Sequence, residues 1–234
     1  MTASSILDQL QALGSEGYRR ILLRHGAALP CYGVKIADMK PIRKQVKKDY
    51  QLALDLYDSG VYDARYLAGL IADDSRMTRE DLQRWVGQAC RPLAGSTVPS
   101  VAAGSRYALE MAREWIDSGK ELIAAAGWTT FGGYVSLSQN PDPDPAEWEG
   151  LLLRVERTIH EAPDVTRYAM NGFVIAAGSY AASLTSLAET VAGRIGKVEV
   201  EMGETACQVP FAPDYLHKMR ERGLIGKKRK TLKC

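Results

Sequence analysis

Residues 165–181 read VTRYAMNGFVIAAGSYA, and this stretch gives the clearest indication of how the chain folds. Its length and its apolar residues favour a helix over a strand. Gly172 nevertheless lies in its interior, where glycine costs about 1 kcal/mol relative to alanine. The same order of small residue, glycine and large apolar residue, here Asn171-Gly172-Phe173, recurs at Ala68-Gly69-Leu70 and Ala126-Gly127-Trp128. Glycines inside three helices predict helices that approach one another closely, as in stacked helical pairs.

The rest of the chain gives further helical patterns joined by short loops. We predict helices within residues 4–13, 15–26, 37–50, 50–60, 61–73, 77–90, 105–119, 121–137, 146–162 and 183–196. In the segment 37–50, Asp38 is a predicted N-cap, which places Pro41 in the first turn. Only residues 198–202 alternate as a strand would. The predicted fold class is therefore all-α, a helical-repeat solenoid.

Composition excludes several classes of protein. The chain has 234 residues, of which 46% are hydrophobic and 25% charged, values typical of a globular protein rather than a disordered one. Four cysteines without a CxxC pair, and three histidines distant from them, predict no metal site, and no organic cofactor is expected either. The absence of a long apolar run or a signal-like N-terminus predicts a cytoplasmic protein without a membrane partner. The length fits one domain spanning residues 1–234.

Positive charge is concentrated in two segments. Residues 35–48 and 218–234 together hold 14 of the 30 basic residues and only 2 of the 28 acidic ones, whereas the remaining chain has a net charge of −10. The second segment includes the basic C-terminal tail, residues 226–234. This asymmetry favours a polyanion as partner.

Several segments resemble the AlkD-like DNA alkylation repair proteins. The resemblance runs from about residue 15 to residue 232, and its most specific parts are YGVKIADMKPIRK (32–44) and RYAMNGFVIAAGSY (167–180). It implies a C-shaped solenoid of HEAT-like repeats whose basic concave surface holds duplex DNA. Characterised members release positively charged N-alkylated purines, using aromatic side chains and an aspartate that stabilises positive charge on the sugar.

The catalytic residues that this resemblance implies are not retained in an ungapped comparison. The aspartate position falls on Gly95 and the nearer tryptophan on Arg91, and an arginine of the family falls near Ala124. No acidic residue occurs between Asp81 and Glu110. The chain is then a divergent branch without glycosylase activity, or it uses another catalytic set, or the alignment is shifted by one helical turn. No catalytic residue is assigned.

The predicted DNA-binding residues are basic, aromatic or amide side chains. Basic residues of the two positive segments, with two further arginines, are expected to hold phosphates, whereas Trp128, Asn171 and Phe173 are expected to face the DNA groove. For these three residues, and for Arg167, a packing role is the alternative. The tail is equally a phosphate-binding arm or a mobile, solubilising terminus. The predicted basic residues are Lys35, Lys40, Arg43, Lys44, Lys47, Arg106, Arg167, Lys227, Lys228, Arg229 and Lys230.

The favoured function is binding of double-stranded DNA, with excision of alkylated purines as the activity that the resemblance implies. One alternative is a non-catalytic HEAT-repeat module that recognises branched or distorted DNA by its shape. Another is a scaffold that binds a protein partner, a common use of HEAT-type repeats. Acidic residues along the concave surface would favour the scaffold, and basic residues there would favour nucleic acid.

Overall fold

The computed structural model describes residues 1–201, 205 and 207–233, and within these residues the regular elements are helices. The all-α prediction is confirmed, and the described part of 198–202 forms no strand. Segments of 3-10 helix occur at Asp74–Arg76, Ile159–Glu161 and Ala182–Leu184, and a π-helical turn at Leu93–Thr97. The α-helices are α1 (Ala3–Leu13), α2 (Glu16–Arg24), α3 (Ile36–Val46), α4 (Tyr50–Asp58), α5 (Tyr62–Ile71), α6 (Arg79–Gly87), α7 (Val98–Ala103), α8 (Ala108–Ile116), α9 (Glu121–Ser136), α10 (Pro145–Thr158), α11 (Asp164–Tyr180), α12 (Thr185–Ile195) and α13 (Ala212–Glu221).

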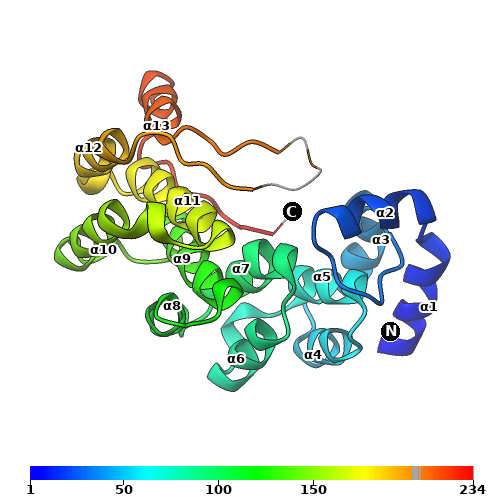
Figure 1. The fold of residues 1–234 in the computed structure, drawn as a ribbon. Coiled ribbons are helices and arrows are strands. Elements are labelled where there is room, and N and C mark those ends of the chain that lie inside the picture. The colour runs from blue at the N-terminus through cyan, green and yellow to red at the C-terminus, as the bar shows by residue number, and fades with distance from the viewer. Residues whose placement is uncertain (202–204, 206, 234) are drawn as a thin grey trace.

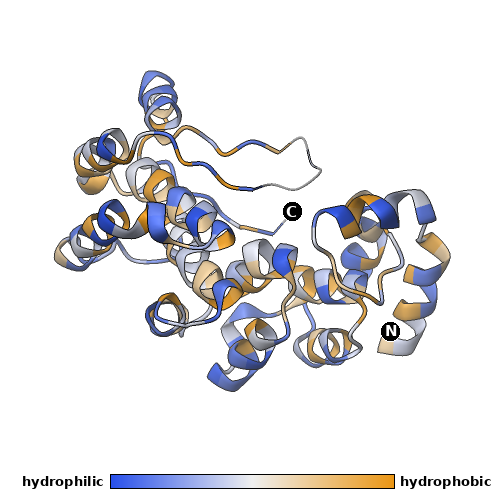
Figure 2. Ribbon diagram, viewed as in Figure 1, coloured by the Kyte–Doolittle hydropathy of each residue, from blue (hydrophilic) through white to orange (hydrophobic). Residues whose placement is uncertain are grey.

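The helices are arranged in an arc (Figure 1). Helices α4, α6, α8 and α10 lie on its convex side, and α5, α7, α9 and α11 lie on its concave side. The described residues of the long connection between α12 and α13 lie over the concave side, and so do the last described residues of the C-terminal tail. Outward faces of α6 and α13 are hydrophilic (Figure 2), as expected of helices that bury only one face.

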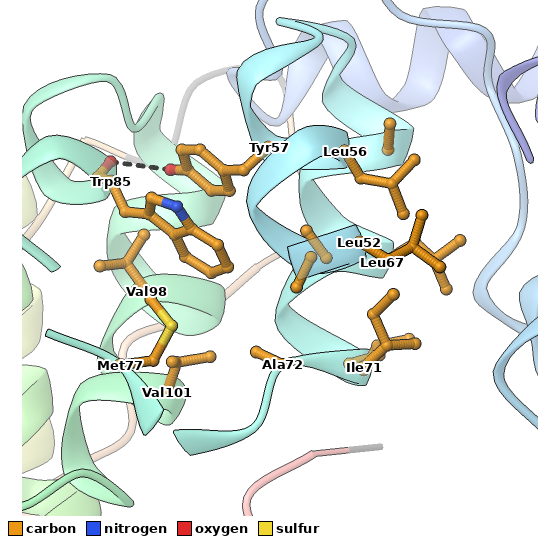
Figure 3. Packing of buried hydrophobic residues seen from close by; sticks show 14 of the residues in the cluster. Leu52, Leu56, Tyr57, Leu67, Ile71, Ala72, Met77, Trp85, Val98 and Val101 are labelled. Atoms are coloured by element: carbon orange, nitrogen blue, oxygen red, sulfur yellow. Dashed lines mark hydrogen bonds between the residues drawn. The ribbon is translucent and has the colours of Figure 1, made fainter. Parts of the chain in front are cut away.

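Two large apolar clusters follow one another along the arc. The first extends from α1 to α9, and Tyr57 stacks on Trp85 within it with ring centroids 4.1 Å apart. Figure 3 shows this pair beside Met77 and Val98, with the Tyr57 hydroxyl donating to the Trp85 carbonyl at 2.8 Å. The second cluster extends from α8 to α13. Each cluster joins several helical pairs, so no pair buries its apolar face alone.

Two of the three mid-helix glycines lie at close helix contacts, as predicted. A Cβ at Gly69 would clash with the Thr97 side chain, and one at Gly127 would lie 2.6 Å from the Ile116 nitrogen. The third prediction is wrong, because Gly172 is exposed and a Cβ there would meet no atom within 4 Å. Glycine at this third position leaves the concave surface open instead of bringing two helices together.

The start of α3 also differs from the prediction. The helix begins at Ile36 with Lys35 as its N-cap residue, so Asp38 lies in the first turn rather than at the cap. Pro41 is consequently inside the helix, where its ring removes one backbone hydrogen bond. The carboxylate of Asp38 remains near the helix N-terminus, where negative charge is favourable.

Asp63 fixes the segment that precedes α3. This carboxylate is fully buried at the start of α5, and it accepts hydrogen bonds from the backbone N–H groups of Tyr32 at 2.6 Å and Val34 at 2.8 Å. Without the carboxylate, these two donors would lose their partners. One buried side chain therefore holds the loop from which the basic helix α3 begins.

Candidate nucleic-acid interface

The concave side has a central cleft of about 380 Å³. Tyr168, Tyr180 and Arg229 line it, and no acidic side chain is among the lining residues that the structure describes. Its walls are otherwise formed mainly by small residues of the π-helical turn, α7, α9 and α11, including Gly95, Ser96, Gly132, Gly133, Gly172 and Ala176. The cleft therefore offers open backbone, aromatic rings and a cation, without a carboxylate to stabilise a cationic sugar.

Gly95 occupies the position at which the family resemblance implies an aspartate. It lines the central cleft, and a Cβ built on it meets no heavy atom within 4 Å. Steric crowding therefore does not explain the glycine. The space for a carboxylate is present, but the carboxylate is not.

The prediction that Trp128 and Phe173 face a DNA groove is wrong for this structure. Each has 1% exposure, and their ring centroids lie 5.2 Å apart within a cluster that also contains Phe131 and Trp148. The cluster is the centre of the second apolar core. Both rings reach the central cleft only from beneath its surface, so their role here is packing.

Asn171 and Arg167 share a helix face, as predicted, but their hydrogen bonds go to backbone groups of the chain itself, and Arg167 also lies 3.7 Å from the Asp164 carboxylate. Asn171 is 2% exposed and donates from Nδ2 to the Pro210 carbonyl at 2.9 Å. Arg167 donates to the carbonyls of Ala162 and, at 2.8 Å, Glu199. These bonds attach α11 to both arms of the connection between α12 and α13. In this structure the two side chains hold the connection against α11 instead of facing DNA as expected.

The six basic side chains of residues 35–48 have no carboxylate partner within 4 Å among the described residues. Lys35, Lys40 and Lys44 are exposed on or beside α3. Arg43 and Lys47 line a pocket of about 230 Å³ that also contains Lys48 and, from the tail, Lys230. We call it the α3–tail pocket; its other charged residues are Asp74 and Lys233. The structure thus brings together two predicted basic segments that are far apart in sequence.

The tail, described for residues 226–233, is bound along the fold rather than mobile, and its predicted role as a phosphate-binding arm stays a prediction. Its backbone bonds to the ends of α11 and α9, through Gly226 N to Ser179 O at 2.8 Å and Arg229 N to Ser136 O at 2.6 Å. Lys233 then reaches the end of α5, where Nζ donates to the Ala72 carbonyl at 2.7 Å. The tail therefore crosses the concave side and connects the C-terminal half of the arc with its N-terminal half.

The four predicted cations of the tail have different surroundings. Lys227 and Lys230 are exposed. Lys228 is half-buried and pairs with Asp142 at 2.8 Å, and Arg229 donates to the Tyr180 hydroxyl at 2.7 Å. Lys228 is therefore less available to a phosphate than predicted, because an internal carboxylate already neutralises it. Lys48 and Lys233, which were not among the predicted site residues, belong to the pocket.

Arg106 lies outside these groups. It is exposed between α7 and α8, stacks over the Tyr107 ring at 4.8 Å and donates to the hydroxyl of that residue. It lines neither the central cleft nor the α3–tail pocket. Its predicted contact with DNA stays a prediction.

Arginines near the convex side are paired in a regular series. Each joins neighbouring helical elements through a carboxylate, and we call the series the convex ladder. Its side chains are partly to well exposed, so each pair contributes little to stability. The pairs are Arg84–Asp58, Arg79–Glu110, Arg79–Glu114, Arg113–Glu147, Arg154–Asp117, Arg194–Glu156 and Arg220–Glu189.

The fold and the pocket define a helical-repeat solenoid with unpaired cations on its concave side. Residues 6–187 match the model of the DNA alkylation repair enzyme family, and the chain belongs to this family. It is 32% identical over 228 residues to the uncharacterized protein Lin0241 of Listeria innocua and, equally, to Lmo0209 of Listeria monocytogenes; each comparison covers 95% of this chain and 99% of the relative.

A solved structure is similar over 100% of both chains, with a TM-score of 0.90 and 33% identity. It represents a new family of proteins related to the HEAT-like repeat DNA glycosylases with affinity for branched DNA structures. This similarity confirms the prediction of a HEAT-like solenoid. Within the described residues, no helix has both the length and the apolar character needed to cross a membrane.

Proposed function

We propose that this protein binds branched DNA through its concave side, and that binding rather than base excision is its principal activity. The observation that carries the proposal is the separation of charge. Arginines of the convex ladder are paired, whereas Arg43, Lys47, Lys48 and Lys230 converge on the α3–tail pocket, where the acid Asp74 is paired with Lys233. Unpaired cations in a concavity attract a polyanion and favour its phosphates.

The preference for a branch rests on the structural relative and on the curvature of the arc. The tail and the described residues of the connection between α12 and α13 lie on the concave side of this arc (Figure 1). The relative of known structure, 33% identical over the whole chain, has affinity for branched DNA. Recognition of this kind reads the path of the backbone rather than base edges. The arms of such DNA are double-stranded, as the predicted partner is.

Base excision and protein scaffolding receive less support. The central cleft has no acidic side chain among its described lining residues, and Trp128 and Phe173 are packed in the core. Asp74 is the acidic residue that lines the α3–tail pocket, and it is paired with Lys233. Two pockets with one paired acid between them fit a protein scaffold less well than they fit nucleic acid.

The test compares a four-way junction with a linear duplex of the same arm sequence. Fluorescence anisotropy at roughly 50 and 200 mM salt gives both affinities and their salt dependence. We expect the junction to bind at least about 10-fold more tightly than the duplex, with both affinities falling steeply as salt rises. Equal affinity for junction and duplex would remove the preference for branches, and binding insensitive to salt would contradict the phosphate-based interface.

A parallel assay addresses excision. Duplex DNA that contains 7-methylguanine or 3-methyladenine is incubated with the protein, and released base is compared with release in buffer. We expect release at the spontaneous rate, because the cleft lacks the carboxylate that would stabilise the cationic sugar. Release well above that rate would show that the protein is a glycosylase with a different catalytic set.

A further inference from the structure

The side chains that line the α3–tail pocket carry an excess of positive charge. Arg43 comes from α3, Lys47 and Lys48 follow that helix, and the tail adds two further lysines. Asp74 is the acidic side chain among the lining residues. Five cations facing one acid leave an excess of positive charge in a concave space, where the potentials of neighbouring charges add.

Asp74 is already neutralised by the tail. Its Oδ1 lies 2.5 Å from Lys233 Nζ, and the side chains of the two residues are 20% and 8% exposed. Burial raises the pKa of the Asp74 carboxyl and lowers the pKa of the Lys233 ammonium, which the charges of Lys48 and Arg43 lower further. These three cations and this acid are therefore close enough to influence one another. The ion pair of Asp74 is nevertheless with Lys233, and not with Arg43, Lys48 or Lys230.

The backbone conformation at Lys47 indicates that the lysines beside the α3–tail pocket have a defined placement. Lys47 has φ 63° and is the one described residue other than glycine with positive φ. A side chain at such an angle costs free energy, and strained residues of this kind cluster at functional sites. The strain ends α3 and places Lys47 and Lys48 beside the pocket instead of continuing the helix.

We propose that the α3–tail pocket is a subsite for a backbone phosphate of the bound DNA. The proposal rests on the proposed function and specifies one place where DNA is held. Lysines act on phosphate as point charges, and a guanidinium can add paired hydrogen bonds to its oxygens. Because Lys230 belongs to the tail and Arg43, Lys47 and Lys48 to the other wall, a phosphate here would also fasten the tail across the concave side.

The first experiment measures lysine accessibility in the full chain. The protein is acetylated briefly alone, with pyrophosphate as a small phosphate probe, or with a saturating four-way junction, and labelling of each lysine is quantified by mass spectrometry. We expect both additions to slow the labelling of Lys48 and Lys230 at least about 3-fold, because a bound anion covers their amino groups. Lys218, exposed on α13, serves as the reference and should label equally in all samples.

The second experiment uses Lys48→Gln and Lys230→Gln, each compared with Lys218→Gln. Each pocket variant should weaken junction binding and lower the slope of log affinity against log salt by about 1, the value for one lost phosphate contact. The Lys218 variant should keep both the affinity and the slope. Thermal unfolding of all three proteins shows whether a loss of binding comes from a loss of folding.

The outcomes separate this inference from the proposed function. A junction that binds normally but leaves Lys48 and Lys230 reactive would overturn the phosphate subsite and leave branched-DNA binding intact. Protection by pyrophosphate without protection by a bound junction would assign the pocket to a free phosphate compound and would also overturn it. If the junction does not bind at all, the proposed function itself fails.

Discussion

The convex ladder and the α3–tail pocket use the same kinds of charge in opposite ways. In the ladder, arginines such as Arg113 and Arg194 pair with glutamates of the next helix on the exposed side. In the pocket, Arg43, Lys47 and Lys48 converge without forming an ion pair, because the acid there, Asp74, is paired with Lys233. Charge that is neutralised along the outside contributes little to long-range attraction, whereas unpaired charge in a concavity attracts a polyanion. Net charge alone, which is +2, reveals neither pattern.

The largest effect that we expect concerns a carboxylate outside the ladder. Asp63→Ala leaves the N–H groups of Tyr32 and Val34 without their acceptor in a buried site. Each unsatisfied buried donor costs about 1–3 kcal/mol, so for two donors we expect a loss of about 2–6 kcal/mol in the free energy of unfolding. Urea denaturation measures it.

The matched control for this variant is Glu147→Gln in the convex ladder. Its partner Arg113 is exposed to solvent, so the change should cost less than about 1 kcal/mol. If the two variants lose equal stability, the contrast between buried and exposed carboxylates is wrong.

Reversal of charge in the α3–tail pocket and in the convex ladder tests the comparison between these two regions most directly. The double variant Arg43→Glu/Lys47→Glu places two acids in the pocket, and Arg113→Glu/Arg194→Glu makes the same change in charge in the ladder. We expect the pocket variant to bind junction DNA about 100-fold more weakly, because phosphate contacts become repulsive. The ladder variant should stay within about 5-fold of the unmodified protein, since its charges lie far from the phosphates. Anisotropy titrations measure both, and equal losses would show that only total charge matters.

The fold class could be predicted from the sequence because helices are indicated by a local pattern, the spacing of apolar residues. Most helices show apolar residues at helical spacing, and these were predicted close to their observed positions. Helices α7 and α13 were not predicted. α7 has only six residues, carries Pro99 near its start and follows a π-helical turn, while α13 carries Pro213 near its own start. Short helices with proline at the first turn give weak periodic signals.

The site could be predicted only in part, because it depends on contacts between distant segments. The basic runs were visible as composition, and the structure places Arg43, Lys47 and Lys230 around one pocket. The addition of Lys233 required knowledge that the tail crosses to the end of α5. The error at Trp128 has another cause: α9 is apolar on most of its faces, so periodicity does not indicate which face is buried.

The smallest effect that we expect separates strain from charge at Lys47. Lys47→Gly and Lys47→Gln remove the same cation from the pocket, but only glycine accommodates φ 63° without a side-chain penalty. Both variants should bind junction DNA several-fold more weakly. The glycine variant should nevertheless be more stable than the glutamine variant by about 1 kcal/mol, or about 2–4 °C in Tm, because relief of strain exceeds the entropy that glycine gains on unfolding. Calorimetry measures the difference in stability between the two variants, and anisotropy measures their binding of junction DNA.

Equal melting temperatures of the two variants would mean that the backbone at Lys47 stores no strain. Equal binding by both variants and the unmodified protein would remove Lys47 from the interface. If the Lys47→Gly variant is more stable than the Lys47→Gln variant and binds junction DNA more weakly than the unmodified protein, the conformation at the end of α3 favours the ligand and destabilises the fold. We expect no such combination for any residue of the convex ladder.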